Sequence, residues 1–207
     1  MNRRLGVLIS GRGSNLQALI EAIRDGRLDA VVAVVISNRP EAAGLDVARR
    51  AGIETRCIDH RTVPSRDDHE RAVARELRAR DVGLVCLAGY MRLIGVPLLE
   101  AFPHAILNIH PSLLPSFPGL DAQRQALEHG VKVAGATVHF VTDELDRGPI
   151  IVQRTVPVLD GDTQATLAAR ILVEEHRAYP EAVSLVLAGG WRVEGRRVVR
   201  DAGAEPA

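Results

Sequence analysis

The chain of 207 residues carries 26 basic and 26 acidic side chains, so its formal net charge is zero. This balance excludes a strongly basic nucleic-acid-binding protein and a protein with an acidic tail. At this length about 70% of the extended chain's surface can be buried, which suffices for one full-sized core but not for two large domains. Of the basic residues 25 are Arg and one is Lys, so Arg side chains or backbone N–H groups must hold any bound anion.

Short β-branched runs alternate with helical stretches through the first half of the chain. The predicted strands cover residues 5–10, 31–37, 55–59, 82–88 and 105–110, and the predicted helices between them cover residues 14–25, 42–51, 66–80 and 97–101. This alternation is typical of a mostly parallel sheet with helices on both faces. We therefore expect an α/β chain with a Rossmann-like, open sheet.

The pattern changes after Pro111, where the Pro-rich residues 113–118 exclude a regular element. A helix is predicted over residues 120–129, two strands over 132–142 and 149–158, a long helix over 163–187, and a hairpin over 191–199. Residues 202–207 are expected to be a frayed tail. The sequence shows neither an internal repeat nor a low-complexity linker, so we predict a single domain over residues 1–207.

Apolar segments and cysteines predict a cytoplasmic protein without a membrane partner. The longest apolar runs, residues 31–36 and 82–88, are far shorter than the roughly 20 residues that cross a bilayer. Residues 1–9 contain only a short apolar stretch after two arginines, which does not fit a signal peptide. Cys57 and Cys86 lie in apolar, strand-like segments without a Cys-x-x-Cys spacing, so we expect both to be buried, inert thiols.

A glycine-rich loop with the sequence Ser-Gly-Arg-Gly-Ser-Asn, residues 10–15, joins the first predicted strand to the first helix. Two glycines allow a tight turn, and N–H groups at the start of a helix bind anions. Leu16 stands where a dinucleotide loop needs a third small residue, and no Gly-Lys-Ser/Thr follows as in a P-loop. The loop favours binding of a single phosphate. A plain turn, in which Ser14 or Asn15 caps the helix, is the alternative.

Asn108 and His110 lie at the carboxyl end of a predicted strand, where open α/β sheets bind ligands. Period-two alternation places both side chains on one face of the strand. The imidazole can transfer protons near neutral pH, and the amide can donate to an oxyanion. Prolines 111, 115 and 118 should make the following loop a rigid wall. Taken alone, His110 could equally be structural.

Three carboxylates, Asp143, Glu144 and Asp146, follow the predicted strand over residues 132–142. One of them could orient His110 and favour its charged form, although a solvated acidic turn is the simpler interpretation. His139 lies on the apolar strand and is interpreted as a core histidine. A metal site of His110, His139 and Asp146 is a further alternative, but the spacing matches no short ligand motif, so we expect no metal.

These motifs occur in one order along the chain: residues 8–11, Leu-Ile-Ser-Gly; residues 87–92, Leu-Ala-Gly-Tyr-Met-Arg; residues 107–115, around Asn-Ile-His-Pro-Ser-Leu-Leu-Pro; residues 139–148; and residues 174–176, Glu-Glu-His. In this order the chain resembles the phosphoribosylglycinamide formyltransferase family over nearly its whole length. The Asn-x-His-Pro motif is shared with methionyl-tRNA formyltransferase and with formyltetrahydrofolate deformylase. The glycine loop and the short length favour the first family.

The resemblance implies a role for each matched residue. The catalytic trio would be Asn108, His110 and Asp146. The ribonucleotide phosphate would bind Gly11, Arg12, Gly13, Ser14 and Asn15, and the glycinamide or ribose would bind Glu175. The folate would bind Arg66, Met91, Arg92, Leu93, Ile94, Asn108, Val141 and Asp146. Ser116, Asp121 and Gln123 depart from common family patterns, which leaves the contacts of that loop open.

The resemblance also implies the formyltransferase fold and a reaction. The formyl group of 10-formyltetrahydrofolate, a co-substrate, would pass to the amine of N1-(5-phospho-D-ribosyl)glycinamide, giving the N2-formyl product and tetrahydrofolate in de novo purine (IMP) biosynthesis. The enzyme would need no metal, nucleic acid or membrane, and would be a monomer or homodimer.

Three alternatives use the same residues differently. A 10-formyltetrahydrofolate hydrolase (deformylase) would use the trio with water as the acceptor, needs no phosphate loop, and in its family carries an extra N-terminal domain. A methionyl-tRNA formyltransferase would need a further C-terminal domain and a basic surface. A folate or nucleotide sensor would bind without reaction, but an amide, an imidazole and a carboxylate at strand ends favour catalysis.

Overall fold

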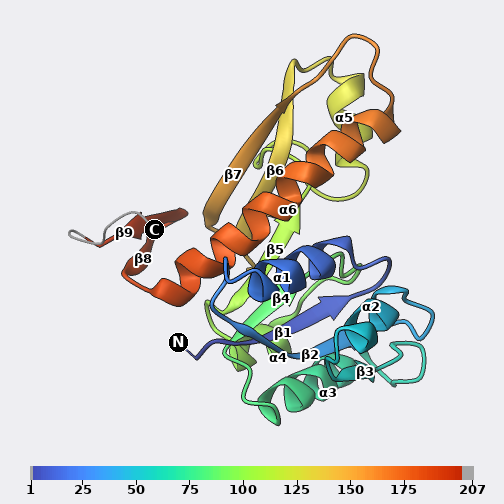
Figure 1. The fold of residues 1–207 in the computed structure, drawn as a ribbon, viewed down its shortest axis with the longest axis vertical. Coiled ribbons are helices and arrows are strands. Elements are labelled where there is room, and N and C mark those ends of the chain that lie inside the picture. Colours follow the sequence, from blue (N-terminus) through green and yellow to red (C-terminus); the bar gives the residue numbers. More distant parts are fainter. Residues whose placement is uncertain (1, 202–207) are drawn as a thin grey trace. The chain divides into compact units, whose positions relative to one another are not determined.

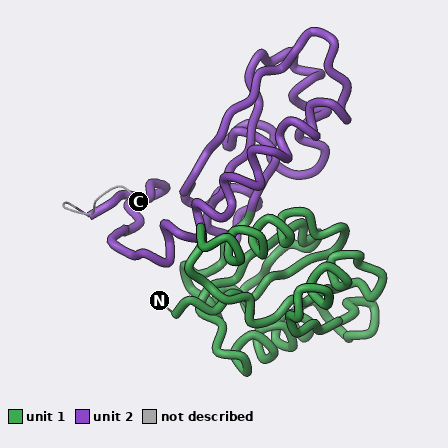
Figure 2. Tube along the Cα trace, in the orientation of Figure 1, with its two compact units in different colours: residues 1–108 green, residues 109–207 purple. Residues whose placement is uncertain are grey.

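The computed structural model describes residues 2–201, and the chain divides into two compact units, residues 1–108 and 109–207 (Figure 2). The predicted frayed tail, residues 202–207, lies outside the described residues. A single domain over residues 1–207 stays a prediction.

The first unit holds a parallel sheet with strand order β3-β2-β1-β4-β5 (Figure 1). Its strands are β1 (Arg4–Ile9), β2 (Val31–Ser37), β3 (Thr55–Cys57), β4 (Leu84–Leu87) and β5 (Ile106–His110), whose last two residues belong to the second unit. Its helices are α1 (Ser14–Arg24), α2 (Gly44–Arg50), α3 (Arg66–Arg78) and α4 (Val96–Ala101). Helix α1 packs with α2 and α3 packs with α4, and Figure 1 shows α1 and α3 on opposite sides of the strands.

This arrangement confirms the predicted α/β class with a mostly parallel sheet. The central strand β1 is buried on both faces, because Leu5, Val7, Leu8 and Ile9 are fully covered by the helices. Helix α3 approaches closely over Gly6, where an added Cβ would overlap the side chain of Leu77. The sheet core of this unit therefore depends on a small residue at one position and aliphatic residues at the others.

One sequence prediction about this unit is wrong. Cys57 is exposed and does not lie in the core, whereas Cys86 on β4 is buried as predicted. Strand β3 has three residues instead of the predicted five and pairs only with β2 at the sheet edge. An apolar run predicts a strand but not whether the strand lies at the edge or the centre, and only central strands are covered on both sides.

The second unit holds α5 (Ala122–Glu128), the strands β6 (Val133–Phe140) and β7 (Ile150–Pro157), the long helix α6 (Gln164–Ala188) and the hairpin β8 (Trp191–Glu194) and β9 (Arg197–Arg200). β6 and β7 are antiparallel, and α6 packs along both of them (Figure 1). Thr163 and Thr166 form a capping box that begins α6. Among residues 2–201 no helix is both long and apolar enough to cross a membrane.

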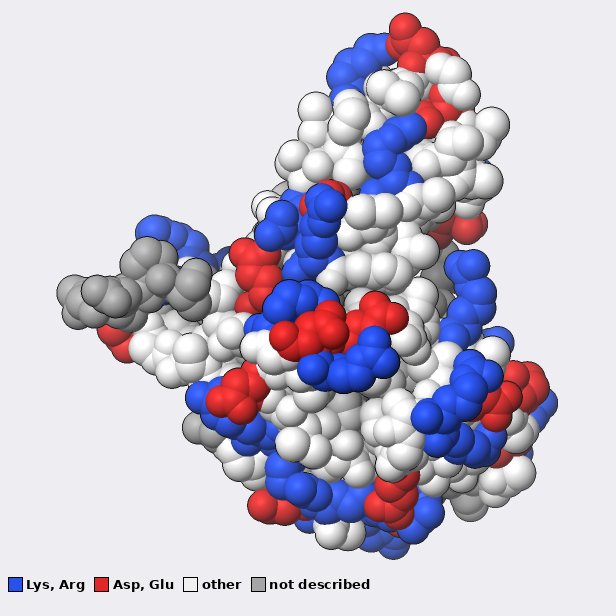
Figure 3. Space-filling view, viewed as in Figure 1, with Lys and Arg blue, Asp and Glu red and all other residues white. Residues whose placement is uncertain are grey.

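Charge is balanced locally on the surface as well as over the whole chain. On the face drawn in Figure 3, basic and acidic side chains lie interspersed. In the first unit, for example, Arg80 contacts Glu54 at 2.7 Å and Glu76 at 2.9 Å, and Arg56 contacts both carboxylates too. Exposed pairs of this kind contribute little stability each, so the balance mainly affects solubility and the long-range field.

The buried His69 of α3 is expected to make the stability of the protein depend on pH. Its side chain is 1% exposed, and Nε2 donates to the Ile58 carbonyl at 2.9 Å. Burial lowers the pKa of His69 below its ordinary value of 6.5. Below that pH the unfolded chain binds more protons than the folded one, so stability is present above pH 6.5 and is lost as the pH falls toward the folded pKa.

We therefore expect the free energy of unfolding in urea to fall between pH 7.5 and pH 5.5. In His69→Gln, which removes the titrating group, part of that loss should disappear. The control is His104→Asn, which changes an exposed histidine with a left-handed backbone that Asn tolerates, and it should retain the full pH dependence. Equal pH dependence in all three proteins would contradict the assignment.

Candidate active site

The glycine loop between β1 and α1 is shaped by Gly13. Gly13 has φ +80° and is the N-cap residue of α1, without a side-chain capping hydrogen bond. A Cβ on Gly13 would lie 2.7 Å from the Gly44 Cα, and Gly44 N–H donates to the Gly11 carbonyl at 2.9 Å. The alternative in which Ser14 or Asn15 caps the helix is wrong, because both residues lie within α1. The N-cap residue of α1 therefore supplies no side-chain acceptor to the first turn, which is compatible with binding of an anion by its N–H groups.

Two predicted folate-binding elements lie close together in the first unit. Arg66 is the first residue of α3, and residues 91–94 follow β4. Arg66 Nε donates to Glu70 Oε1 at 3.1 Å, and the same oxygen accepts from Gly95 N–H at 2.8 Å. Met91 and Leu93 are more than half exposed, whereas Ile94 is buried. The structure thus brings Arg66 and residues 91–94 together through a residue, Glu70, that the sequence did not indicate.

Strand β5 carries Asn108 and His110, as predicted. Asn108 is half-buried and is the partner of Leu87 in the parallel pairing with β4. His110 is the last residue of the strand and is buried. Both residues lie at the carboxyl end of the strand, which in open α/β sheets is the ligand-binding edge.

In the second unit, Asp146 is the carboxylate that faces His110. Its Oδ2 lies 3.5 Å from His110 Nδ1 and accepts from Gly119 N–H at 2.8 Å. Its Oδ1 lies 3.7 Å from His139 Nε2. Asp146 and both histidines are buried, whereas Asp143 and Glu144 are exposed. The tertiary structure therefore selects one of the three candidate carboxylates.

Both ring nitrogens of His110 face acceptors. Nε2 donates to the Phe117 carbonyl at 2.9 Å, and Nδ1 faces Asp146. An imidazole can donate at both nitrogens only when it is doubly protonated. Burial lowers the pKa of His139 below its ordinary value, so that ring favours the neutral state. The arrangement sets a buried imidazole against a buried carboxylate, a pairing that suits proton transfer.

Two residues at this site have left-handed backbones. Phe117 and Asp146 have φ values of +55° and +53°, a region that a bulky residue such as Phe avoids and that Asp tolerates better. Phe117 supplies the carbonyl that accepts from His110, and Asp146 supplies the carboxylate. Strain of this kind clusters at functional sites. Neither Phe117 nor Gly119 was a candidate in the sequence, because they contribute backbone groups, and no side-chain motif signals those.

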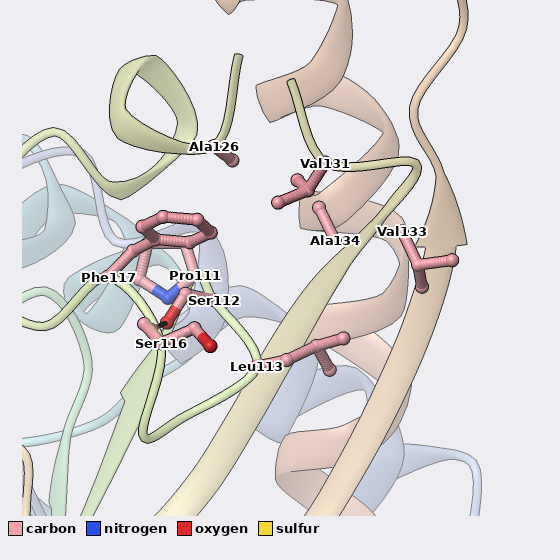
Figure 4. A pocket seen from close by; sticks show the side chains of 9 residues that line it. All are labelled: Pro111, Ser112, Leu113, Ser116, Phe117, Ala126, Val131, Val133 and Ala134. Carbon is pink, nitrogen blue, oxygen red and sulfur yellow. Dashed lines mark hydrogen bonds between the residues drawn. The ribbon is translucent and has the colours of Figure 1, made fainter. Parts of the chain in front are cut away.

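Glu175 and Val141 also lie in the second unit. Glu175 is a buried carboxylate on α6, and Val141 is half-buried, one residue after β6. A small, mostly apolar pocket in this unit lies between the 111–117 loop, α5 and the start of β6 (Figure 4). Its lining is Pro111, Ser112, Leu113, Ser116, Phe117, Ala126, Val131, Val133 and Ala134. None of the predicted site residues lines this pocket.

The metal alternative finds no support in the part of the chain that is described. Within residues 2–201 no group of three or more His, Cys, Asp or Glu side chains is arranged to hold a metal ion, and His110, His139 and Asp146 do not form one. The expectation that the protein needs no metal stays a prediction.

Comparison with known proteins places the chain in a family. The model of the formyl transferase family matches residues 3–183. The phosphoribosylglycinamide formyltransferase of Escherichia coli is 44% identical over 190 residues, which cover 92% of this chain and 87% of that protein. The crystal structure of glycinamide ribonucleotide transformylase 1 from Symbiobacterium toebii superposes with a TM-score of 0.95 at 60% identity, covering 97% of this chain and 95% of the other.

Two further similar proteins differ from this chain in length or in sequence. The human trifunctional purine biosynthetic protein adenosine-3 is 50% identical over 186 residues, which are 90% of this chain but only 18% of that protein. The chain therefore spans less than a fifth of the length of that relative. A formyltetrahydrofolate deformylase from Pseudomonas syringae superposes with a TM-score of 0.88 but at 28% identity, covering 98% of this chain and 67% of the other.

The two glycines of the loop provide a matched pair of variants. Gly13→Ala should destabilise the protein by roughly 1–3 kcal/mol, because it combines a positive φ with a Cβ pressed against Gly44. Gly11→Ala should cost much less, because its Cβ would meet nothing within 4 Å. Urea unfolding of both variants measures the difference. Equal losses of stability would show that Gly13 does not shape the loop.

Proposed function

Because the chain belongs to the formyl transferase family, we propose that it transfers a formyl group from 10-formyltetrahydrofolate to the amine of N1-(5-phospho-D-ribosyl)glycinamide. This reaction belongs to de novo purine biosynthesis. The observation that carries the proposal is the buried contact between His110 and Asp146, with Asn108 two residues before His110 on β5. The full-length similarity to proteins named for this reaction supports the choice of substrates.

The reaction forms one bond and breaks another. The neutral glycinamide amine attacks the formyl carbon, and a tetrahedral species forms whose oxygen carries negative charge. Collapse of that species breaks the bond between the formyl carbon and N10 of the folate, and the proton lost by the amine is delivered to N10. No oxidant or reductant is needed, so the protein has to position the reactants, stabilise an oxyanion and move a proton.

His110 and Asn108 supply the groups for these tasks. The Asn108 amide donates to the developing oxyanion, and the protonated His110 adds a second, charged donor. Asp146 acts through His110: its carboxylate faces Nδ1 at 3.5 Å and holds the ring in place. Gly119 N–H in turn holds Asp146, so backbone groups determine the direction of the pair.

Each substrate has a proposed set of binding residues. The ribonucleotide phosphate binds residues 11–15, where N–H groups of the first turn of α1 bind the anion without a lysine. Glu175 accepts from the glycinamide or ribose part. The folate binds Arg66, residues 91–94, Val141, Asn108 and Asp146. Met91 and Leu93 offer exposed apolar surface for the folate ring system, and Arg66 offers a cation for its acidic end.

The predictions about domain number, location, oligomeric state and metal also remain proposals. We assign residues 1–207 to one formyltransferase domain that works in the cytoplasm as a monomer or homodimer, without a metal. The hydrolase alternative would use water as the acceptor, but it leaves the glycine loop without a task. Its structural representative is also the more distant one, at 28% identity against 60%.

The two reactions differ in their dependence on the ribonucleotide. Purified protein with 10-formyltetrahydrofolate should form tetrahydrofolate only when glycinamide ribonucleotide is present, as followed by absorbance. Formate release at the same rate without the ribonucleotide would establish the hydrolase instead.

Substitutions at the site should lower turnover without unfolding the protein. We expect His110→Ala and Asp146→Asn each to lower kcat by roughly a hundredfold or more, because general acid catalysis and an oriented oxyanion donor are each worth about that factor. The matched control is Glu144→Gln, which changes an exposed carboxylate of the same loop that pairs with Arg147, and its kcat should stay near the wild-type value. Near wild-type turnover in His110→Ala would refute the assignment.

A further inference from the structure

Residues 91–95 form an irregular segment held by buried side chains at both ends. The segment runs from β4 to α4 without regular secondary structure. At its start, Met91 N–H donates to Ser10 Oγ at 2.8 Å. At its end, Gly95 N–H donates to Glu70 Oε1 at 2.8 Å. Ser10 is 4% exposed and Glu70 is 3% exposed; Ser10 follows β1 and Glu70 lies on α3.

Ser10 connects three parts of the first unit. It directly follows β1, and its N–H donates to the Gly89 carbonyl at 3.1 Å. Its hydroxyl accepts from Met91 N–H and donates to Asn38 Oδ1 at 2.5 Å, and Asn38 is itself buried just after β2. Because the hydroxyl proton is directed at Asn38, the oxygen lone pairs are left for Met91. Ser10 is also the residue from which the glycine loop begins.

Glu70 holds two of the proposed folate-binding elements with one oxygen. Oε1 accepts from Gly95 N–H and from Arg66 Nε, so the carboxylate links the end of the segment to the first residue of α3. The fit around Gly95 is close: an added Cβ would lie 3.1 Å from both carboxylate oxygens and 3.2 Å from Arg66 Nη2. The other oxygen, Oε2, is buried and has no hydrogen-bond partner within the described part of the chain.

Core packing does not account for these contacts. The segment that they hold presents Met91 and Leu93, whose exposed fractions are 58% and 57%. Burying a carboxylate with one unsatisfied oxygen costs free energy, and proteins retain such arrangements mainly where function requires them. Two buried polar groups thus define the shape of a surface segment whose apolar side chains are largely exposed.

We propose that Ser10 and Glu70 are positioning residues, which hold residues 91–95 and Arg66 in the shape that binds the folate co-substrate. This inference rests on the proposed function, because it takes those residues as the folate-binding elements. Neither residue touches the reacting atoms. Their effect is on preorganisation: without them the segment and Arg66 must be ordered when the co-substrate binds, which weakens binding and leaves the chemical step unchanged.

Ser10→Ala tests the first contact, with Ser37→Ala as the matched control. Ser37 is equally buried, ends the neighbouring strand and lies opposite Ile9, but its hydroxyl bonds to the backbone of Arg39 and not to residues 91–95. Ser10→Ala should raise KM for 10-formyltetrahydrofolate about tenfold and change kcat less than about twofold, because an amide donor loses its acceptor. Ser37→Ala should leave KM unchanged.

Glu70→Ala and Glu70→Gln test the second contact. The alanine variant should raise the same KM about tenfold, because both Arg66 and Gly95 lose their acceptor. Glutamine retains an oxygen for Gly95 N–H but loses the charge that faces Arg66, so it should restore part of the affinity. The control is Glu76→Ala, a more exposed carboxylate on the same helix that pairs with Arg56 and Arg80, and it should have no effect on KM.

Hydrogen exchange provides a readout that does not depend on activity. The Met91 amide should exchange at least about tenfold faster in Ser10→Ala than in the wild type, and at the wild-type rate in Ser37→Ala. If either alanine variant fails to fold, two other variants replace them. Glu70→Gln should have a KM above that of the wild type, and Ser10→Thr, which retains a hydroxyl, should keep the Met91 exchange rate of the wild type.

Failure of the inference and failure of the proposed function give different results. A wild-type protein without ribonucleotide-dependent transfer would remove the proposed function, whatever the exchange rates show. An active wild type whose Ser10→Ala and Glu70→Ala variants keep KM unchanged would overturn the positioning role. Variants that lose kcat at unchanged KM would also overturn it, since they would place these residues in the chemical step.

Discussion

Parallel pairing of β1 with β4, and of β4 with β5, is the constraint on which the first unit depends. It aligns Leu8 with Leu87 and Leu87 with Asn108, so the carboxyl ends of these three strands lie together. The segments that follow the strands therefore lie together as well: the glycine loop after β1, residues 91–95 after β4, and Asn108 near the end of β5. The faces of a parallel sheet are covered by apolar side chains, so polar groups lie at the carboxyl ends of its strands.

In the second unit, the corresponding constraint is the burial of one carboxylate. Asp146 lies between two imidazoles and is held by the Gly119 amide. Burying a carboxylate costs free energy unless hydrogen-bond donors or other polar groups face it, and here the Gly119 N–H and the two rings do so. The positive φ of Phe117, which a bulky residue rarely adopts, indicates that its loop accepts backbone strain where the Phe117 carbonyl meets His110.

Most elements could be predicted from the sequence, while their ends and surroundings could not. The helix over residues 163–187 and the strand over residues 31–37 agree with α6 and β2 to within about one residue, because strong periodicity and a capping threonine define them. The strand over residues 55–59 ends after Cys57 instead, and that cysteine is exposed. Hydrophobic pattern records the local tendency of a segment but not its position in the sheet.

The sequence by itself determined the fold class and the family, and it indicated candidate site residues, because all of these follow from periodicity and from motifs that are local in the chain. Only the tertiary structure decided that Asp146, and not Asp143 or Glu144, faces His110, and that Gly13, and not Ser14 or Asn15, is the N-cap residue of α1. It also brought Ser10 and Glu70 to the two ends of one segment. The physical reason is that a hydrogen bond between groups 25 or 81 positions apart depends on how the elements between them pack, which no short stretch of sequence specifies.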